Sequence, residues 1–254
     1  MDHRIERIKV CLNGGRGRGD HPRVPLSPAE LAESAAGAVA AGAEAIHLHP
    51  RGGDGRESLL AADVGAAVAA VRRACPAIPA GVSTGLWIAD GDPMARHAAV
   101  AAWAGLPSSA RPDFASVNMS EPGSPALAGV LQTAGIQAEA GVWSVDDAAR
   151  LAAAGPATRW LRILVEIIDV PAAGAVTAAD GILGRLDELG VTVPRLLHGE
   201  QRACWPLVVH AGRLGLPTRI GLEDTVVGPD GAAVSGNAEL TQLALEILAA
   251  SARR

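Results

Sequence analysis

The chain has 254 residues, of which 49% are hydrophobic and 19% charged, and its formal net charge is −5. This composition fits one globular domain and excludes an intrinsically disordered or collagen-like chain. The 22 basic and 27 acidic residues form no basic stripe, so we expect no nucleic acid partner. The charged N-terminus and the interrupted apolar runs predict neither a signal peptide nor a membrane span, and we expect a cytoplasmic location.

Eight strand-like runs alternate with Ala- and Leu-rich helical segments along the chain. The first helix is expected to begin after Ser27, an N-cap candidate whose capping box Glu30 can close, and to stop at Gly42. The expected strands are 8–13, 45–50, 78–85, 114–119, 136–143, 160–167, 195–199 and 219–224. The later helices are expected near 62–74, 93–103, 125–134, 145–154, 177–189, 203–214 and 237–249. Eight βα units predict a single-domain (β/α)8 TIM barrel over residues 1–254, with a doubly wound open sheet as the alternative.

Charged side chains follow the strand phase that should point into the barrel, since residues two apart on a strand face the same side. Lys9 and Arg162 come early in their strands and are expected to pair with Glu139 or Glu166 low in the barrel, because unpaired buried charges are costly. A second group lies at the carboxyl ends, where such barrels keep their active sites. Its members are His47, His49, Ser83, Asn118, His198, Glu223 and Asp224.

The run Ile46-His47-Leu48-His49 puts two imidazoles on one face of one strand. Such a pair can bind one divalent ion, and the alternative is two core histidines satisfied by hydrogen bonds. Glu223 shares the phase of Arg219 on the last strand and is the expected third ligand. Two histidines and a glutamate with an open fourth position are typical of catalytic zinc. Asp224 follows the strand, where it either turns to the pocket as a base or caps a loop.

Two glycine-rich loops follow the first two strands. The loop at 52–55 is expected to be a tight turn, with Arg51 placed for a carboxylate. The stretch GGRGRG at 14–19 lacks the spacing and the lysine of a phosphate-binding loop. The five tryptophans are expected to fill the packing between helices and barrel.

Several stretches together are similar to one enzyme family. They are LNGG with HP inside 12–22, GAEAIHLHPRGGDGR at 42–56, VSTG at 82–85, SVN at 116–118, RIGLED at 219–224 and NAEL at 237–240. They span most of the chain and resemble the β-keto acid cleavage enzymes typified by 3-keto-5-aminohexanoate cleavage enzyme. The resemblance implies a zinc-dependent TIM barrel that takes a β-keto acid and acetyl-CoA and yields acetoacetate and a new CoA ester. It also implies a homo-oligomer, a dimer or tetramer.

The resemblance assigns roles residue by residue. The implied zinc ligands are His47, His49 and Glu223. Asp224 and Arg219 are implied to manage proton transfer, and Ser83 to contact the substrate. A divalent ion on the keto oxygen would stabilise an enolate, which fits these roles. The remaining candidate substrate-binding residues are Asn13, Arg51, Thr84, Gly85, Ser116, Asn118, Glu139 and His198.

Two positions depart from the family pattern. Gly15 stands where some members carry an acidic residue, and His198-Gly199-Glu200-Gln201-Arg202 replaces a Gly- and Arg-rich turn after the seventh strand. The sequence leaves three roles open for His198: an acid–base group, an outer contact of the metal, or a packed histidine. The alternatives are a metal-dependent hydrolase or lyase that does not use CoA and a metabolite-binding barrel without turnover. A Schiff-base aldolase is disfavoured because Lys9, the lone lysine, lies at the start of its strand.

Overall fold

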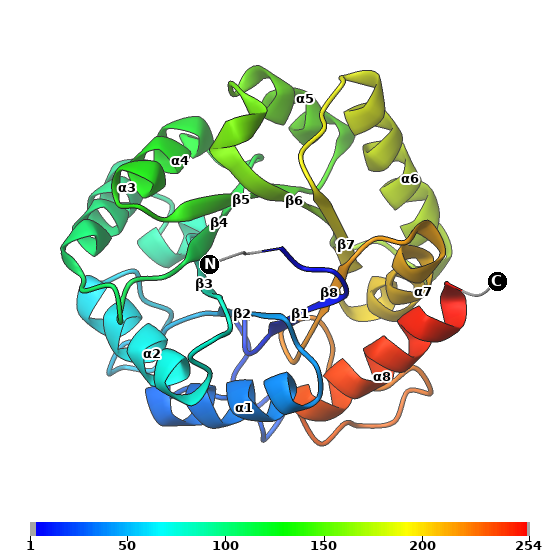
Figure 1. The fold of residues 1–254 in the computed structure, drawn as a ribbon, viewed down its shortest axis with the longest axis horizontal. Helices are drawn as coiled ribbons and strands as arrows, with labels where there is room; N and C mark the ends of the chain where they lie inside the picture. Colours follow the sequence, from blue (N-terminus) through cyan, green and yellow to red (C-terminus); the bar gives the residue numbers. More distant parts are fainter. Residues whose placement is uncertain (1–3, 253–254) are drawn as a thin grey trace.

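The computed structural model describes residues 4–252, in which eight parallel strands form a ring enclosed by helices (Figure 1). The strands are β1 (Ile8–Cys11), β2 (Ala45–Leu48), β3 (Ala80–Ser83), β4 (Phe114–Asn118), β5 (Gln137–Val142), β6 (Trp160–Ile167), β7 (Arg195–Gly199) and β8 (Thr218–Ile220). The α-helices are α1 (Pro28–Ala40), α2 (Ala61–Ala74), α3 (Pro93–Ala101), α4 (Ser124–Thr133), α5 (Val145–Ala153), α6 (Ala172–Glu188), α7 (Cys204–Leu214) and α8 (Asn237–Ser251). Short 3-10 helices are η1 (Leu86–Ala89), η2 (Ala102–Gly105), η3 (Ala157–Arg159) and η4 (Gln201–Ala203). None of these described helices is long and apolar enough to cross a membrane.

The ring of strands is nearly closed. Strand pairing runs in the order β7-β6-β5-β4-β3-β2-β1-β8. Between β7 and β8, the Leu197 N–H donates to the Pro217 carbonyl at 3.0 Å and the Thr218 hydroxyl donates to the Leu197 carbonyl at 2.7 Å. This arrangement confirms the predicted (β/α)8 TIM barrel against the open-sheet alternative.

The predicted element boundaries hold at some places and fail at others. The capping box of α1 is formed, because Ser27 accepts from the Glu30 N–H and the Glu30 carboxylate accepts from the Ser27 N–H. Helix α6 begins at Ala172, directly after Pro171 and five residues before the predicted start at 177. Strand β8 ends at Ile220 rather than at 224.

Gly221 directly follows β8 and lies close to the β1 backbone. A Cβ atom at this position would lie 1.8 Å from the Cys11 carbonyl oxygen, so the chain here passes directly against the β1 backbone. The chain then turns, with the Asp224 N–H donating to the Gly221 carbonyl at 2.8 Å. Glu223 is therefore held by a turn, and the prediction that it continues the strand phase of Arg219 was wrong.

The amino-terminal half of the barrel interior is filled by a buried ion cluster. The Lys9 ammonium lies 2.7 Å from one Glu139 oxygen, and the Arg162 guanidinium lies 3.3 Å from the other. Both cations also lie over the ring of Phe114, at 5.6 and 5.4 Å from its centroid. This confirms the predicted pairing of Lys9 and Arg162 with Glu139, and the layer closes the barrel below the pocket described next.

Candidate metal centre and active site

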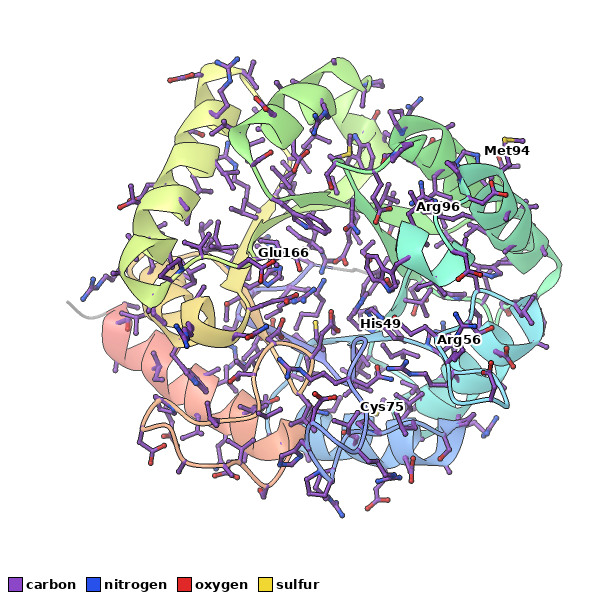
Figure 2. All side chains as sticks on the ribbon, turned by 180° about the vertical axis from the view of Figure 1, so that it is seen from behind. His49, Arg56, Cys75, Met94, Arg96 and Glu166 are labelled. Atoms are coloured by element: carbon purple, nitrogen blue, oxygen red, sulfur yellow. The ribbon has the colours of Figure 1, made fainter. Side chains whose placement is uncertain are left out.

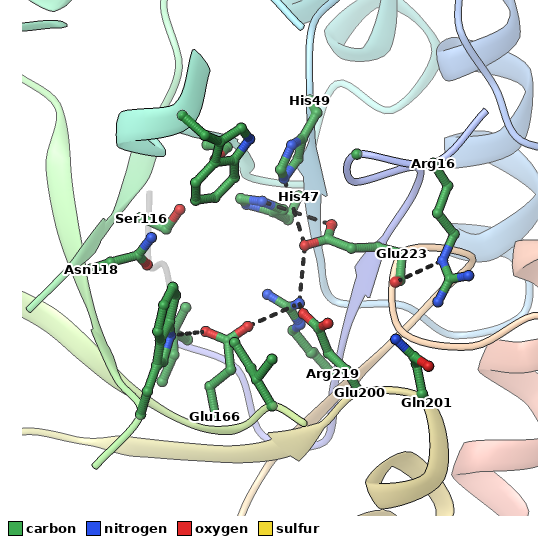
Figure 3. Close-up of a pocket in the computed structure, with 16 residues that line it drawn as sticks. Arg16, His47, His49, Ser116, Asn118, Glu166, Glu200, Gln201, Arg219 and Glu223 are labelled. Atoms are coloured by element: carbon green, nitrogen blue, oxygen red, sulfur yellow. Dashed lines mark hydrogen bonds and ion pairs between the residues drawn. The ribbon is translucent and has the colours of Figure 1, made fainter. Parts of the chain in front are cut away.

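A pocket of about 420 Å³ lies at the carboxyl ends of the strands (Figure 3). Figure 2, which views the molecule from the side opposite to Figure 1, shows His49 and Glu166 close to the barrel axis and Arg56 farther out. The lining residues are Gly15, Arg16, His47, His49, Ser83, Trp87, Ser116, Asn118, Trp143, Leu164, Glu166, Ile168, Glu200, Gln201, Arg219 and Glu223.

Three side chains converge on one point of this pocket. His47 lies in β2, His49 follows that strand directly, and Glu223 comes from the turn after β8. The Nε2 atom of His47 lies 3.9 Å from Oε2 of Glu223, and Nε2 of His49 lies 3.5 Å from Oε1. Potential ligand atoms of all three residues lie within 4.8 Å of one another. The structure thus brings together the three residues that the sequence predicted as metal ligands.

The chemistry of this donor set fits a divalent ion. Burial lowers the pKa of His47 well below its usual value, which leaves a neutral imidazole able to donate a lone pair. Burial opposes ionisation of Glu223, but Arg219 and the two histidines outweigh it and hold the pKa of that carboxyl well below its usual range. Its Oε2 atom is buried and has no hydrogen-bond partner among residues 4–252. A neutral His47 imidazole and an ionised Glu223 carboxylate, with pocket space beside them, are ligands that suit a catalytic zinc ion.

His49 is fixed by contacts on both its backbone and its ring. The Asn13 amide donates to the His49 carbonyl and accepts from the His49 N–H, both at 2.9 Å. The His49 Nδ1 atom hydrogen-bonds to the Glu57 carboxylate, which also accepts from the Trp87 indole at 3.0 Å. Burial alone would lower the pKa of His49, but Glu223 and Glu57 raise it to about 9. Asn13 and Glu57 therefore aim Nε2 of His49 at the metal position.

Arg219 is the centre of the charge cluster beside the metal position. Its buried guanidinium nitrogen Nη2 lies 2.8 Å from Asp224, 2.9 Å from Glu223, 3.3 Å from Glu166 and 3.6 Å from Glu200. Burial works against the charge of Arg219, but the surrounding carboxylates hold its pKa well above the usual value. One permanent cation thus faces four carboxyl groups from three strand ends. Figure 3 shows three of them, Glu166, Glu200 and Glu223, around Arg219.

Two of these carboxyl groups hold protons near neutral pH. Burial raises the pKa of Asp224 to about 7, against the opposing charge of Arg219. Burial and the nearby charge of Glu166 raise the pKa of Glu200 to about 8. Asp224 is fully buried and, within the described chain, is not part of the pocket lining, whereas Glu200 is. The pocket-facing acid of the pair is therefore Glu200.

The predicted substrate-binding residues divide into two groups. Ser83, Ser116 and Asn118 line the pocket. Thr84 hydrogen-bonds to the Ser116 carbonyl, and Gly85 donates its N–H to the Ser83 hydroxyl at 3.2 Å. Thr84 and Gly85 thus shape the wall without lining it.

The other predicted residues lie away from the pocket surface. Glu139, expected to contact substrate, is instead buried below the pocket in its pairs with Lys9 and Arg162. Arg51 donates to the carbonyls of Gly14 and Arg16 and faces a neighbouring pocket.

His198 lies fully buried between two carboxylates of the charge cluster. Its ring nitrogens are 3.8 Å from Glu166 and 3.9 Å from Asp224, and neither forms a hydrogen bond with another described residue. Burial and the charge of Arg219 lower the pKa of His198 well below its usual value, so the ring is neutral. This placement is that of a packed neighbour of the Arg219 cluster, outside the substrate space.

Several pocket residues were not predicted from the sequence. Glu166, expected low in the barrel, instead lines the pocket and accepts from the Trp143 indole at 2.9 Å. Trp87 and Trp143 line the pocket, so the prediction that all tryptophans serve helix packing was wrong for these two. Trp143 and Glu200 directly follow β5 and β7, and that position was the available signal for both.

The sequence matches the family model for the beta-keto acid cleavage enzyme over residues 7–254. The chain belongs to the beta-keto acid cleavage enzyme family. Similar solved structures are a binary complex of ObcA with oxaloacetate (TM-score 0.67, 20% identity) and a ternary complex of ObcA with a C4-CoA adduct and oxalate (TM-score 0.68, 19% identity). Both matches cover 91% of this chain, which spans 64 to 65% of ObcA.

A more distant match shows how widely the barrel is shared. The 3-dehydroquinate dehydratase of Geobacillus kaustophilus HTA426 is similar at a TM-score of 0.62 and 8% identity, over 95% of this chain and 91% of that one. At such identities the structural likenesses establish the fold alone. Membership in the beta-keto acid cleavage enzyme family rests on the sequence match, and the converging ligands give it a chemical basis.

Proposed function

We propose that this protein is a zinc-dependent enzyme that condenses a β-keto acid with acetyl-CoA and forms acetoacetate and a new CoA ester. The observation that carries the proposal is the convergence of His47, His49 and Glu223 beside Arg219, in a member of this family. ObcA complexes with oxaloacetate, itself a β-keto acid, and with a C4-CoA adduct support the same classes of substrate.

The metal ligands and the polar wall have separate tasks. His47, His49 and Glu223 would hold the ion, which when bound supplies positive charge that acidifies the proton between the two carbonyl groups of the substrate. Ser83, Ser116 and Asn118 line the opposite part of the pocket and offer hydrogen bonds to the substrate carboxylate. The filled layer below closes this end of the pocket, so each hydrogen bond acts in a low dielectric.

Proton transfer is assigned to the Arg219 cluster. Asp224 accepts from Nε of Arg219 at 2.9 Å and has no surface on the pocket, so it acts by holding the guanidinium in place and charged. Glu200 lies on the pocket wall with a pKa of about 8, so only its ionised fraction can take the α-proton, and the acid formed in that step returns the proton later. Arg219 then stabilises the negative charge that develops during carbon–carbon bond formation and cleavage.

The net reaction exchanges two acyl groups. The carboxymethyl carbon of the keto acid forms a bond to the acetyl carbonyl carbon, and its bond to the original acyl group breaks. The thiolate that acetyl-CoA releases takes up that acyl group. One proton leaves the carboxymethyl carbon and one returns to it, so no external oxidant or reductant is needed.

The test is a coupled assay with the zinc-loaded protein, acetyl-CoA and a panel of β-keto acids. We expect acetoacetate to form, and His49→Ala to lose both bound zinc and turnover. Glu200→Gln and Asp224→Asn should keep zinc but lose turnover by at least about 100-fold. Glu33→Gln, the same change on an exposed face of α1, is the matched control.

Other outcomes would overturn the proposal. Product formed without acetyl-CoA would indicate a metal-dependent hydrolase or lyase. Thermal stabilisation by keto acids without any product would indicate a binding protein. Full zinc retention in His49→Ala would reject the ligand assignment.

A further inference from the structure

A second pocket adjoins the metal pocket on the outer side of Trp87. It has a volume of about 350 Å³, within the range of roughly 300 to 1,000 Å³ typical of small-molecule sites. Gly15, Arg16 and Trp87 line both pockets, so the two spaces share a wall. A Cβ atom on Gly15 would touch the Glu57 carboxylate at 3.6 Å, so a side chain at this position would occupy the wall that the two pockets share.

One side of this second pocket is basic. Arg16, Arg51 and Arg56 come from the loops after β1 and β2. Arg51 is tied to the loop carbonyls, but its buried Nε atom has no partner within the described part of the chain. Arg56 is 75% exposed, and its pair with Asp90 at 3.4 Å is equally exposed and therefore weak. The guanidinium of Arg56 is thus available to a ligand.

The other side of the pocket is apolar and partly aromatic. Leu26, Trp87 and Ile88 line it, and Trp87 is 49% exposed although its indole N–H is bound to Glu57. The carboxylate of Glu57 also lines the pocket, but its oxygens are engaged by His49 and Trp87. The pocket therefore offers cations on one side and flat apolar surface on the other.

We propose that this pocket binds the phosphorylated nucleotide end of the acyl-CoA co-substrate, with the pantetheine arm crossing Gly15 to reach the metal pocket. Guanidinium groups are the preferred partners of phosphates, and an adenine ring stacks well on indole. The inference rests on the proposed function for the identity of the ligand. It goes beyond that function because it assigns the nucleotide to Arg56 and Trp87, outside the metal pocket.

The experiment measures binding of acetyl-CoA and of acetyl-pantetheine, which lacks the nucleotide, by isothermal titration calorimetry without keto acid. We expect acetyl-CoA to bind more tightly, with an affinity that falls as salt rises. Arg56→Ala should weaken acetyl-CoA binding about tenfold, and Arg56→Glu should weaken it further. The ratio of the acetyl-CoA affinity to the acetyl-pantetheine affinity should be smaller in Arg56→Ala than in wild type, and smaller still in Arg56→Glu. Arg73→Glu, on the last turn of α2 at the other end of the barrel, is the matched control.

The outcomes separate this inference from the proposed function. Acetyl-CoA binding that is equal in wild type and Arg56→Glu overturns the inference, and turnover in the coupled assay would then leave the function standing. Arg56-dependent binding without turnover on any keto acid supports the nucleotide site and rejects the function. Equal affinity for both thioesters in the wild type overturns the nucleotide site.

Discussion

Glu57 offers a test of the metal centre that does not remove a ligand. Its carboxylate holds Nδ1 of His49 and is itself held by the Trp87 indole, and its side chain is 14% exposed. Carboxylates in this position typically contribute about 10- to 100-fold to metal affinity, or about 1.4 to 2.8 kcal/mol. Glu57→Gln keeps the shape and an acceptor oxygen but loses the charge, so we expect the zinc Kd to rise about tenfold. Glu57→Ala loses both contacts, and we expect a rise near 100-fold.

Protons compete with zinc for His49, so the effect of removing Glu57 should depend on pH. The Glu57 charge helps to raise the pKa of His49 to about 9, so zinc must displace a proton from His49 at neutral pH. Removal of Glu57 lowers this pKa and eases the displacement, which offsets part of the affinity loss at pH 7. As the pH rises past about 9, proton competition at His49 fades, so more of the affinity loss should appear.

The assay is a competitive titration of zinc against a chromophoric chelator, at about pH 7 and about pH 9.5. Glu33→Gln serves again as the control for an exposed glutamate. A zinc Kd for Glu57→Ala within twofold of wild type at both pH values would refute the argument that Glu57 orients His49.

Three further expectations concern the framework of the site. The pKa of Glu200 is about 8 in the folded protein and about 4.5 in the unfolded chain. Between pH 4.5 and pH 8 the folded state therefore binds more protons than the unfolded chain, and the free energy of unfolding falls as the pH rises through this range. Urea unfolding from pH 5 to 8 should show a shallower fall for Glu200→Gln, and an unchanged slope would contradict this. Glu139→Gln removes the carboxylate that faces the buried cations Lys9 and Arg162 and should lower the free energy of unfolding by about 3 kcal/mol. A loss below about 1 kcal/mol would count against the ion cluster. Gly221→Ala should push the turn off the β1 backbone and displace Glu223, which metal analysis would detect as lost zinc, whereas normal zinc content would show that the turn adapts.

The sequence was sufficient for the barrel and for part of the site. The two-residue spacing predicted a common face for His47 and His49, because His47 lies in a paired strand and His49 follows its last residue, where the alternation still holds. The early positions of Lys9 and Arg162 likewise predicted their burial with Glu139. These inferences needed only the position of each strand and the set of its residues that face the barrel interior.

The remaining features depend on loops, where alternation no longer applies. Glu223 was predicted to lie near the two histidines, and it does. The reason given, that it continues the strand phase of Arg219, was wrong because β8 ends at Ile220. Asp224 faces Arg219 because a turn rotates it away from the pocket. Glu57 and Trp87 meet His49 through tertiary contacts across loops, which no local spacing encodes.

The joint between β7 and β8 has a dynamic consequence. Within residues 4–252, one main-chain hydrogen bond and one hydroxyl hydrogen bond join these strands, whereas the other neighbouring strands are paired in ladders. Segments with so few protecting contacts open locally at less cost than the whole molecule unfolds. Arg219 lies in β8 and Glu200 directly follows β7, so local opening of this joint would change the 3.6 Å distance between their charged groups. The charge cluster is therefore tied to the weakest seam of the barrel, and hydrogen exchange of the β8 amides should report its opening.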